Sequence, residues 1–554
     1  MNNASLELGG DNWAAKDGNL LGYAVGDSSG KYVPNEFTFT RGSNLSATRV
    51  NADGYIEKGY ENTLLGSNDW AQSDSQYEIT GGEAGYDGTN DAWLVNKLAA
   101  AYFGKGGVSI SSVATISIYA KAGSLDKLLV FFAGESARFD LTNVTAVKSG
   151  GGTIGQSIEL VSGTTDWYRC SLVINVTSSG NLLIKPLNSS NQDVTGTMYI
   201  QDAMINQGLA ALPYVESGAS TAKAGTLENE PRIDYSSGTA SLLLEPQRTN
   251  LVEYSEYFDA WNVKNNITLT SNFSESPEGL NNSTKITSTG GVSTIRIDLP
   301  VTIGDSYTFS FYIKNIDATN IKLEIYDRAN FFIEQNIENN ISTSVWTRYT
   351  YTFTSTNTAS NATFEIKGFT GSFEIWGAQV EQDATYETSY IPTYGTSQTR
   401  AGDNCFTNNS LLKQTSATYF LETTPIEILS NNLIEVRGNG GTSNRVVFQA
   451  NANGSIRVLV RAQGSSILDQ NVGSVVSRNT KVKLALKYTP SNISFFVDGV
   501  KKIDTDVSVD FSPELNGLDL EGSETANDDA LKQHQFLFFP EALSDADCIT
   551  LTTI

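Results

Sequence analysis

The sequence predicts an all-β protein built from tandem antiparallel β-sandwiches of the jelly-roll type. Charged residues make up only 18% of the 554 residues, whereas 24 Tyr, 25 Phe and 48 Gly are present. Short strands rich in aromatic and β-branched residues, joined by polar turns, have this composition. A chain of this length also exceeds what one hydrophobic core supports, so we expect several domains.

An internal repeat is the second observation that predicts this architecture. Residues 49–225 correspond to residues 232–402, and no long helical period occurs in either copy. The segment TISIYAK at 115–121 matches TFSFYIK at 308–314, and both alternate with a period of two. Two copies of short alternating strands indicate two related sandwiches in tandem.

The alternation predicts which side chains of the matched strands enter the core. One face of each strand should be buried, and the other should meet solvent or a groove. The serines Ser117 and Ser310 should therefore point away from the core. The expected core residues are Ile116, Ile118, Phe309 and Phe311.

A polar string that follows three leucines recurs in weaker form in the first copy. The string SLLLEPQRTN at 241–250 has its echo in IEKGYEN at 56–62. Each copy carries an Arg, then a Glu, then an Asn five residues after the Glu: Arg49, Glu57 and Asn62, and Arg232, Glu245 and Asn250. We interpret the string as a structured junction, because buried polar groups that are hydrogen-bonded can fix how one module enters the next.

The remaining segments follow from where the repeat and its alternation stop. The residues before the repeat contain no long apolar alternation and are expected to form an extension, and the pattern changes again near residue 405. The expected segments are an N-terminal extension or docking segment at 1–48, the first sandwich at 49–225, a connector at 226–243, the second sandwich at 244–404 and a C-terminal domain at 405–554.

Charge and cysteine usage limit the classes of partner and compartment. The formal net charge is −24, which repels nucleic acid and anionic membranes. The start MNNASLELGG has no basic and apolar leader pattern, and the longest apolar run, LLVFFA at 128–133, is too short to cross a bilayer as a helix. Three scattered cysteines predict no disulfide framework, so we expect synthesis in a reducing cytoplasm without membrane insertion.

Few residues offer catalytic or metal-binding chemistry. The one histidine, His534, alternates with Phe536 and Phe538 and lacks a nucleophile motif, so a structural role is expected. One His and three scattered Cys exclude a His/Cys zinc site by count. The acidic stretch EGSETANDD at 521–529 could bind calcium, but a solvated acidic loop is the favoured interpretation. We therefore expect no catalytic residue, no resident metal and no cofactor.

One aromatic residue is a candidate for ligand binding. Sugar-binding modules need an aromatic platform with nearby polar groups. Trp376 is out of phase with the core residues Phe373 and Ile375, and Gln201 takes its place in the first copy, so the fold does not require it. It could form a sugar platform or pack against a neighbouring module or subunit.

Several strings resemble those of bacteriophage virion appendage proteins. They are FTFTRGSNLSATRVNADGYIE, LLLEPQRTNLVEYSEYFDAW, SFYIK with WTRYTYTF, and IWGAQVEQDATYETSYIPTYGTSQTRA. These strings look like tail-fibre, tail-spike or head-fibre components built from carbohydrate-binding-module-like jelly rolls. Residues 410–554, with the hairpin FVDGVKK, resemble the concanavalin A-like lectin and laminin-G sandwich.

The resemblance implies a non-enzymatic virion protein, a fibre or appendage subunit that presents carbohydrate-binding-like modules to a host-surface glycan. It further implies a homotrimer that joins other virion proteins through its N-terminal segment and is made in the host bacterial cytoplasm. Two alternatives stay open. One is a capsid or tail decoration protein without a glycan ligand, and the other is a polysaccharide depolymerase that uses paired carboxylates.

Overall fold

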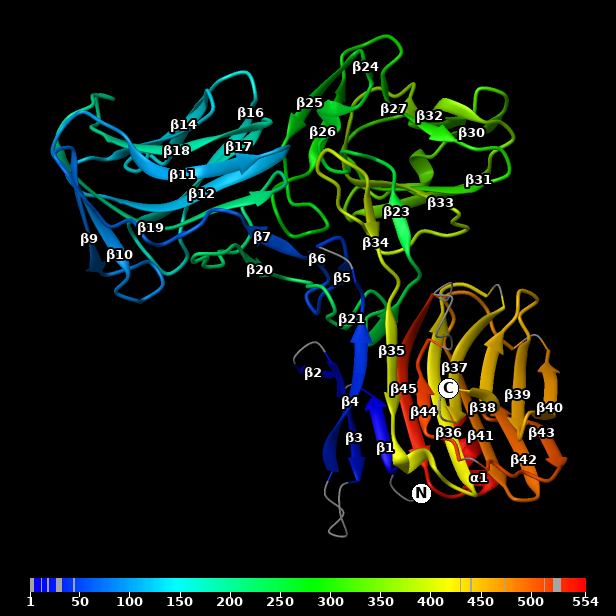
Figure 1. The fold of residues 1–554 in the computed structure, drawn as a ribbon. Coiled ribbons are helices and arrows are strands. Elements are labelled where there is room, and N and C mark those ends of the chain that lie inside the picture. Colours follow the sequence, from blue (N-terminus) through cyan, green and yellow to red (C-terminus); the bar gives the residue numbers. More distant parts are fainter. Residues whose placement is uncertain are drawn as a thin grey trace. The chain divides into compact units, whose positions relative to one another are not determined.

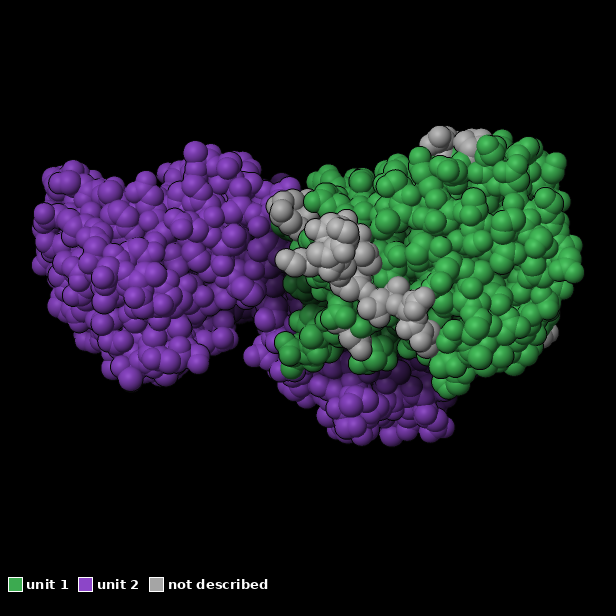
Figure 2. Space-filling view, turned by 90° about the horizontal axis from the view of Figure 1, so that it is seen from below, with its two compact units in different colours: residues 1–57, 226–248, 399–554 green, residues 58–225, 249–398 purple. Residues whose placement is uncertain are grey.

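The all-β prediction is confirmed by the computed structural model (Figure 1). The structure describes residues 4–10, 12–16, 19–25, 32–42, 45–428, 430–438, 441–473, 475–512, 514–521 and 530–554. They form antiparallel sheets, three short 3-10 helices and, within these ranges, one α-helix, α1 (Asp545–Thr552). Figure 2 colours the two compact units into which the chain divides. Unit 1 consists of residues Met1–Glu57, Thr226–Arg248 and Thr399–Ile554, and unit 2 of Lys58–Gly225 and Thr249–Gln398.

The first sandwich, in unit 2, packs a seven-stranded sheet against a five-stranded sheet. The larger sheet has the order β16 (Thr153–Leu160), β17 (Trp167–Asn175), β12 (Val113–Ala122), β19 (Gly196–Gln207), β10 (Ala92–Lys97), β9 (Tyr77–Glu83) and β8 (Gln72–Ser73). The smaller has the order β11 (Phe103–Ile110), β18 (Ser178–Leu187), β13 (Lys127–Phe132), β14 (Glu135–Asp140) and β15 (Thr145–Ser149). A two-stranded ribbon pairs β7 (Tyr60–Asn62) with β20 (Ala222–Ala224).

The second sandwich repeats this arrangement. Its larger sheet contains β25 (Ile267–Ser271), β26 (Thr284–Ser288), β33 (Ser372–Gln382), β28 (Ser306–Asn315), β31 (Thr347–Thr354), β23 (Arg248–Asn250) and β34 (Gln398–Arg400). Its five-stranded sheet has the order β24 (Val263–Asn265), β27 (Thr294–Val301), β32 (Ala359–Lys367), β29 (Lys322–Tyr326) and β30 (Phe331–Asn336). The 3-10 helices η1 (Phe258–Ala260) and η2 (Glu338–Asn340) lie in its loops.

Unit 1 is one system of paired strands that nearly closes into a barrel. Its N-terminal and connector strands are β1 (Leu6–Gly9), β2 (Ala14–Lys16), β3 (Asn19–Val25), β4 (Tyr32–Thr40), β21 (Arg232–Asp234) and β22 (Ser241–Leu244). Its C-terminal strands are β35 (Asn404–Asn408), β36 (Ala417–Pro425), β37 (Asn431–Gly438), β38 (Gly441–Ala450), β39 (Ile456–Ala462), β40 (Ser465–Val472), β41 (Val482–Thr489), β42 (Asn492–Val497), β43 (Val500–Asp506), β44 (Gly517–Asp519) and β45 (Leu531–Phe539). The 3-10 helix η3 (Ser410–Leu412) and a small ribbon of β5 (Thr48–Val50) and β6 (Ile56–Lys58) complete the described elements.

Residues 1–48 are not the separate extension that the sequence predicted. Strand β1 pairs with β45, with Leu6 opposite Phe538, and β4 pairs with β35, with Phe39 opposite Cys405. The side chains of Leu6 and Phe39 are buried in the core of unit 1. The N-terminal strands therefore complete the C-terminal domain, because burying their apolar faces there removes them from water.

The predicted core faces are confirmed. The side chains of Ile116, Ile118, Phe309 and Phe311 are at most 1% exposed and lie in the cores of the two sandwiches. The prediction that the opposite face meets solvent or a groove is wrong.

In each sandwich, the segment that follows the last strand in sequence, β19 or β33, covers the opposite face of the larger sheet. Arg169 donates to the hydroxyl of Ser117 at 3.2 Å, and Arg348 donates to that of Ser310 at 3.1 Å. Both serines are buried. In the first copy the same arginine also donates to the carbonyl of Ala211, in the covering segment, at 3.4 Å.

A buried asparagine makes the same four hydrogen bonds in each sandwich. The Asn62 amide donates to the carbonyls of Ala203 and Val215, and its oxygen accepts from the backbone N–H groups of Leu64 and Ile205. This asparagine joins the entry segment, the last strand and the covering tail, and leaves none of its polar atoms unpaired.

In the second sandwich, Asn250 donates to the carbonyls of Ala378 and Ile391 and accepts from Val252 and Val380. Both asparagines are 0% exposed. The asparagine of the polar string therefore fixes the chain path within each sandwich.

Replacing Asn250 with Ala should destabilise the second sandwich by at least about 3 kcal/mol, because four buried backbone groups lose their partner at once. Urea unfolding followed by tryptophan fluorescence measures this change in the free energy of unfolding. The matched control is Asn361→Ala, because Asn361 is an exposed asparagine in β32 of the same sandwich. Equal urea-unfolding midpoints for the two variants would show that the hydrogen bonds of Asn250 do not stabilise the sandwich as described.

Candidate functional site

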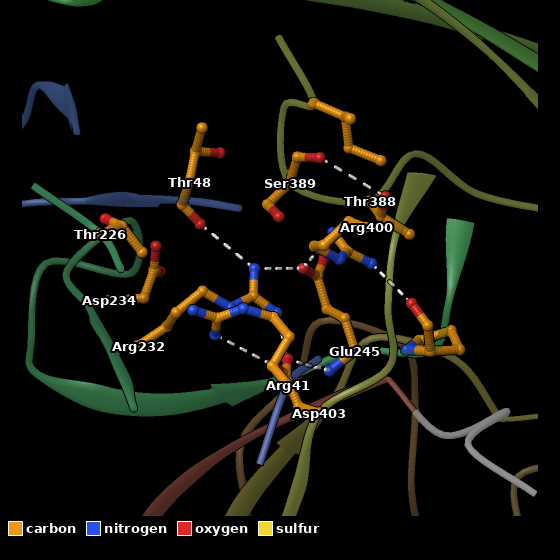
Figure 3. Close-up of polar contacts among 12 residues, drawn as sticks. Arg41, Thr48, Thr226, Arg232, Asp234, Glu245, Thr388, Ser389, Arg400 and Asp403 are labelled. Atoms are coloured by element: carbon orange, nitrogen blue, oxygen red, sulfur yellow. Dashed lines mark hydrogen bonds and ion pairs between the residues drawn. The ribbon is translucent and has the colours of Figure 1, made fainter. Parts of the chain in front are cut away.

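The polar string forms a buried cluster of charges in unit 1 (Figure 3). Arg41 lies 3.2 Å from Asp403, and both Arg232 and Arg400 lie 2.7 Å from the same oxygen of Glu245. The five side chains are at most 2% exposed. Arg232 also contacts Asp403, so the two carboxylates and the three guanidinium groups form one connected network.

Backbone carbonyls complete this network. Arg41 donates to the carbonyls of Leu227 and Glu230, and Arg232 donates to that of Thr48 at 3.1 Å. Burial lowers the pKa of Arg41 to about 10, although Asp403 opposes that shift. A cluster that is closed to solvent and tied to the backbone holds segments together, and we assign it no ligand.

In the first copy the corresponding pair, Arg49 and Glu57, is 2.7 Å apart. Each side chain is about 30% exposed, so this pair contributes little to stability.

Trp376 does not form a platform that is open to solvent. It points away from the core, as its phase in the strand predicted, but its side chain is 0% exposed. Its ring packs against Tyr312 and Tyr390, with centroid distances of 5.6 and 4.6 Å. The tail of the second sandwich, which carries Tyr390, covers the ring, so Trp376 is not the open aromatic platform considered from the sequence.

The cysteines and the acidic stretch were also considered from the sequence. All three cysteines are buried and free. Within the described ranges, no group of three or more His, Cys, Asp and Glu is arranged to hold a metal ion. Residues 522–529 of the acidic stretch considered for calcium lie outside the described residues. None of the described helices is long and apolar enough to cross a membrane.

His534 is buried and shares a hydrogen bond of 2.9 Å between its Nε2 and the hydroxyl of Thr424. Burial lowers its pKa from 6.5 to about 4, and the nearby Lys481 acts in the same direction. The neutral ring is therefore the form that the fold accommodates.

Because this pKa is depressed, the unfolded chain takes up a proton near pH 6.5 and the folded chain does not. Stability should therefore fall as the pH decreases from 6.5 towards 4. The chain has one histidine, so a carbon-13 label on histidine gives a single ring signal. The midpoint of the pH titration of this signal should lie near pH 4, and a midpoint near pH 6.5 would show that the ring is solvated.

Charged and aromatic side chains meet on the outer face of the five-stranded sheet in the second sandwich, which we call the second outer face. Two rows of cross-strand partners build it. One row contains Arg296, Glu365, Glu324 and Glu334, and the other contains Asp298, Thr363, Tyr326 and Phe331, in each case from β27, β32, β29 and β30 in turn.

The first row is a line of charges held by ion pairs. Lys367 contacts Glu324 and lies 4.0 Å from Glu365, and Arg296 lies 3.9 Å from Glu365. Glu324 and Glu365 are only 7% and 8% exposed, so they form the floor of the face. Burial raises the pKa of Glu365, and the neighbouring Glu324 adds to this shift.

The second row ends in an aromatic platform. The rings of Tyr326 and Phe331 stack with a centroid distance of 4.4 Å and an angle of 18° between their planes. Phe331 is 59% exposed. Arg328 lies over the ring of Tyr326 and also 3.3 Å from Asp298, which joins the platform to the charged part of the face.

The sequence reasoning missed this platform. A bulge between Ile325 and Tyr326 shifts the register of β29 against β30, and it brings Tyr326 opposite Phe331. Simple alternation counted from the strand ends does not give this pairing. An available signal was the pair of aromatic residues flanking the short turn DRAN at 327–330.

The equivalent face of the first sandwich has different chemistry. One row of cross-strand partners on this face contains Lys185, Leu129, Arg138 and Val147. The next row places Leu183 beside Phe131. This face combines the charged residues Lys185 and Arg138 with apolar residues such as Val147, which is 59% exposed, so its chemistry differs from that of the second outer face.

Residues 253–372 match a family described as a carbohydrate binding domain, CBM 4/9. The matched segment contains all five strands of the five-stranded sheet of the second sandwich, β24 to β32, and therefore both rows of the second outer face. A comparison with curated proteins gave no match.

Several solved structures match part of the chain at low sequence identity. The Ruminococcus gnavus IT-sialidase CBM40 bound to α2,3 sialyllactose is 14% identical, covers 26% of this chain and 85% of its own, and has a TM-score of 0.24. The Caenorhabditis elegans galectin LEC-6 is 15% identical, with 24% and 89% covered and a TM-score of 0.20. Domain 4 of the arabinanase AbnA from Geobacillus stearothermophilus, in complex with arabinotriose, is 9% identical, with 27% and 73% covered and a TM-score of 0.23.

Proposed function

We propose that this chain is a non-enzymatic glycan-binding protein that binds a saccharide at the second outer face. The single observation that carries the proposal is the stacked pair Tyr326 and Phe331 beside a fixed line of carboxylates and cations, within the segment that matches a carbohydrate binding domain. The setting we propose is a bacteriophage virion, as a fibre or appendage subunit that adheres to a host-surface glycan. This setting rests on the sequence resemblance.

The chemistry of the face suits a sugar. One side of a sugar ring is apolar and stacks on aromatic rings, whereas its edge carries hydroxyl groups that both donate and accept hydrogen bonds. Phe331 offers the exposed ring, Glu365 and Glu324 accept hydrogen bonds, and Arg296 donates them. The ion pairs hold these groups in place before a ligand arrives, so little side-chain entropy is lost on binding.

The carboxylate pair Glu324 and Glu365 favours a second candidate, a polysaccharide depolymerase. A glycosidase needs one acid with a raised pKa beside a second carboxylate, and Glu365 meets the first condition. However, the two residues are direct partners on neighbouring strands of one sheet. Both carboxylates therefore belong to the same face of one sheet, whereas a glycosidase places its two carboxylates on either side of the scissile bond. We favour binding without cleavage for this reason.

The remaining alternative, a decoration protein without a glycan ligand, leaves the second outer face without a role. It predicts that no variant of this face changes binding to host polysaccharide. Neither the homotrimer nor the attachment to other virion proteins bears on this choice, and we keep both as part of the proposed virion setting.

The test uses the full chain against an array of bacterial surface polysaccharides, followed by calorimetry on the best ligand. Phe331→Ala should weaken binding about tenfold or more, because it removes half of the aromatic stack. Glu365→Gln should also weaken it, because the charged acceptor becomes a neutral amide.

The matched control is Phe273→Ala, since Phe273 is another exposed aromatic residue of the same sandwich, 42% exposed. It should bind as the parent does. A reducing-end assay on the same ligand separates binding from cleavage. Release of reducing ends that stops in the Glu365→Gln variant would establish the depolymerase instead.

A further inference from the structure

Three arginines stand side by side on one sheet of unit 1. Arg437 of β37 is the cross-strand partner of Arg445 in β38, and Arg445 is the cross-strand partner of Arg461 in β39. These three strands are neighbours in the sheet (Figure 1), and we call the three residues the arginine row. Like charges placed directly opposite each other destabilise a sheet. The row therefore carries an electrostatic cost, in a chain whose formal net charge is −24.

The arginine row lies on the outer side of its sheet. Val446 and Val460, which adjoin Arg445 and Arg461 in the sequence, are buried in the core of unit 1. Because successive side chains of a strand point to opposite faces, the arginines point away from that core. The side chains of Arg437 and Arg445 are 12% and 25% exposed, and Arg461 is half-buried. The row therefore reaches solvent from stems that pack along the sheet.

The positive charge of the row is compensated unevenly. Asp519 lies 3.7 Å from the first arginine of the row, and Glu435 lies 3.5 Å from the second. Among the described residues, Arg461 forms no ion pair, and its guanidinium donates to the backbone carbonyl of Gly464 at 2.9 Å. The end of the row in β39 therefore has a positive charge without a carboxylate beside it.

Another arginine of β39 shows how a carboxylate satisfies a guanidinium on this face. The Nε and Nη2 groups of Arg457 donate to the two carboxylate oxygens of Asp469, each at 2.7 Å. This bidentate arrangement is the one that a planar guanidinium favours with an oxyanion. Arg461 lies on the same side of the same strand and has no such partner among the described residues. An oxyanion from outside the chain would supply it.

Amide side chains lie on the same face, beyond a strip of apolar residues. Asn432 of β37 is the cross-strand partner of Gln449 in β38, whose amide donates to the Asn432 side chain at 3.2 Å. Val447 and Leu459, each 4% exposed, lie between this pair and the arginine row. Amides both donate to and accept from hydroxyl groups, whereas guanidinium groups bind oxyanions. The face thus combines the groups that recognise a sugar with those that recognise an anion.

We propose that the arginine row binds a carboxylate or phosphate group carried by a saccharide, with Arg461 as the principal donor. A guanidinium fork matches both oxyanions. The neighbouring amides favour a saccharide over a bare ion, and the net charge of −24 disfavours nucleic acid as the source of the phosphate. The arginine row belongs to unit 1 and the second outer face to unit 2, so this inference does not depend on the proposed function.

The experiment measures binding by calorimetry to the full chain with the substitution Phe331→Ala, which removes the exposed ring of the second outer face. Two pairs of probes differ in the anionic group: tetragalacturonate with its methyl ester, and glucose 6-phosphate with glucose. At least one anionic probe should bind about tenfold or more tightly than its neutral partner. A preference in the first pair assigns a carboxylate, and a preference in the second assigns a phosphate.

The decisive variant is Arg461→Gln. It should bind the anionic probe about tenfold or more weakly, while its melting temperature stays unchanged or rises, because one of three adjacent like charges is removed. A purely structural arginine would instead lower the melting temperature when replaced. The matched control is Lys502→Gln, which removes the same formal charge from an exposed position in β43 of the same unit and should bind as the parent does.

Three results would overturn the proposal. The first is equal binding, or no binding, of the anionic and neutral probes. The second is an Arg461→Gln variant that binds the anionic probe as tightly as the parent. The third is binding of inorganic phosphate or of a hexaglutamate peptide as tight as that of the anionic saccharide, which would assign the row to a bare ion or to an acidic protein partner.

Discussion

Each sandwich depends on one buried asparagine. Asn62 and Asn250 each join the entry segment to the last strand and to the tail, through two accepted and two donated backbone hydrogen bonds. Because a buried amide must satisfy all of these groups, it fixes where the tail crosses the larger sheet. The tail then covers the outer side of that sheet, and it brings the hydroxyls of Tyr214 and Tyr390 next to those of Ser67 and Ser255.

This constraint leaves the smaller sheet as the face on which the two copies differ. The second copy presents the charged row and the Tyr326–Phe331 stack, whereas the outer face of the first copy carries Leu129, Phe131 and Val147 beside Lys185 and Arg138. Two copies of one fold thus present different outer surfaces.

The sequence predicted those features that depend on local alternation. The period of two assigned Phe311 and Ile116 to the cores, and the repeat revealed the two sandwiches. It did not reveal that β1 pairs with β45, because the two strands lie more than 500 residues apart and each alternates in the same way whichever partner it has. Trp376 was placed on the correct side of its strand, but the tail that covers it gives no signal in the strand itself. The sequence pattern did not predict the stack of Tyr326 and Phe331, because a bulge changes the register of the two strands there.

Hydrogen exchange with a bound host polysaccharide tests the central claim most directly, since it reports where the ligand lies without altering the chain. The account predicts slower exchange in β29, β30 and β32 of the second sandwich, residues 322–336 and 359–367, and unchanged exchange in the matched strands β13, β14 and β18 of the first. Protection confined to unit 1, or to the five-stranded sheet of the first sandwich, would contradict the assignment of the second outer face as the glycan-binding surface.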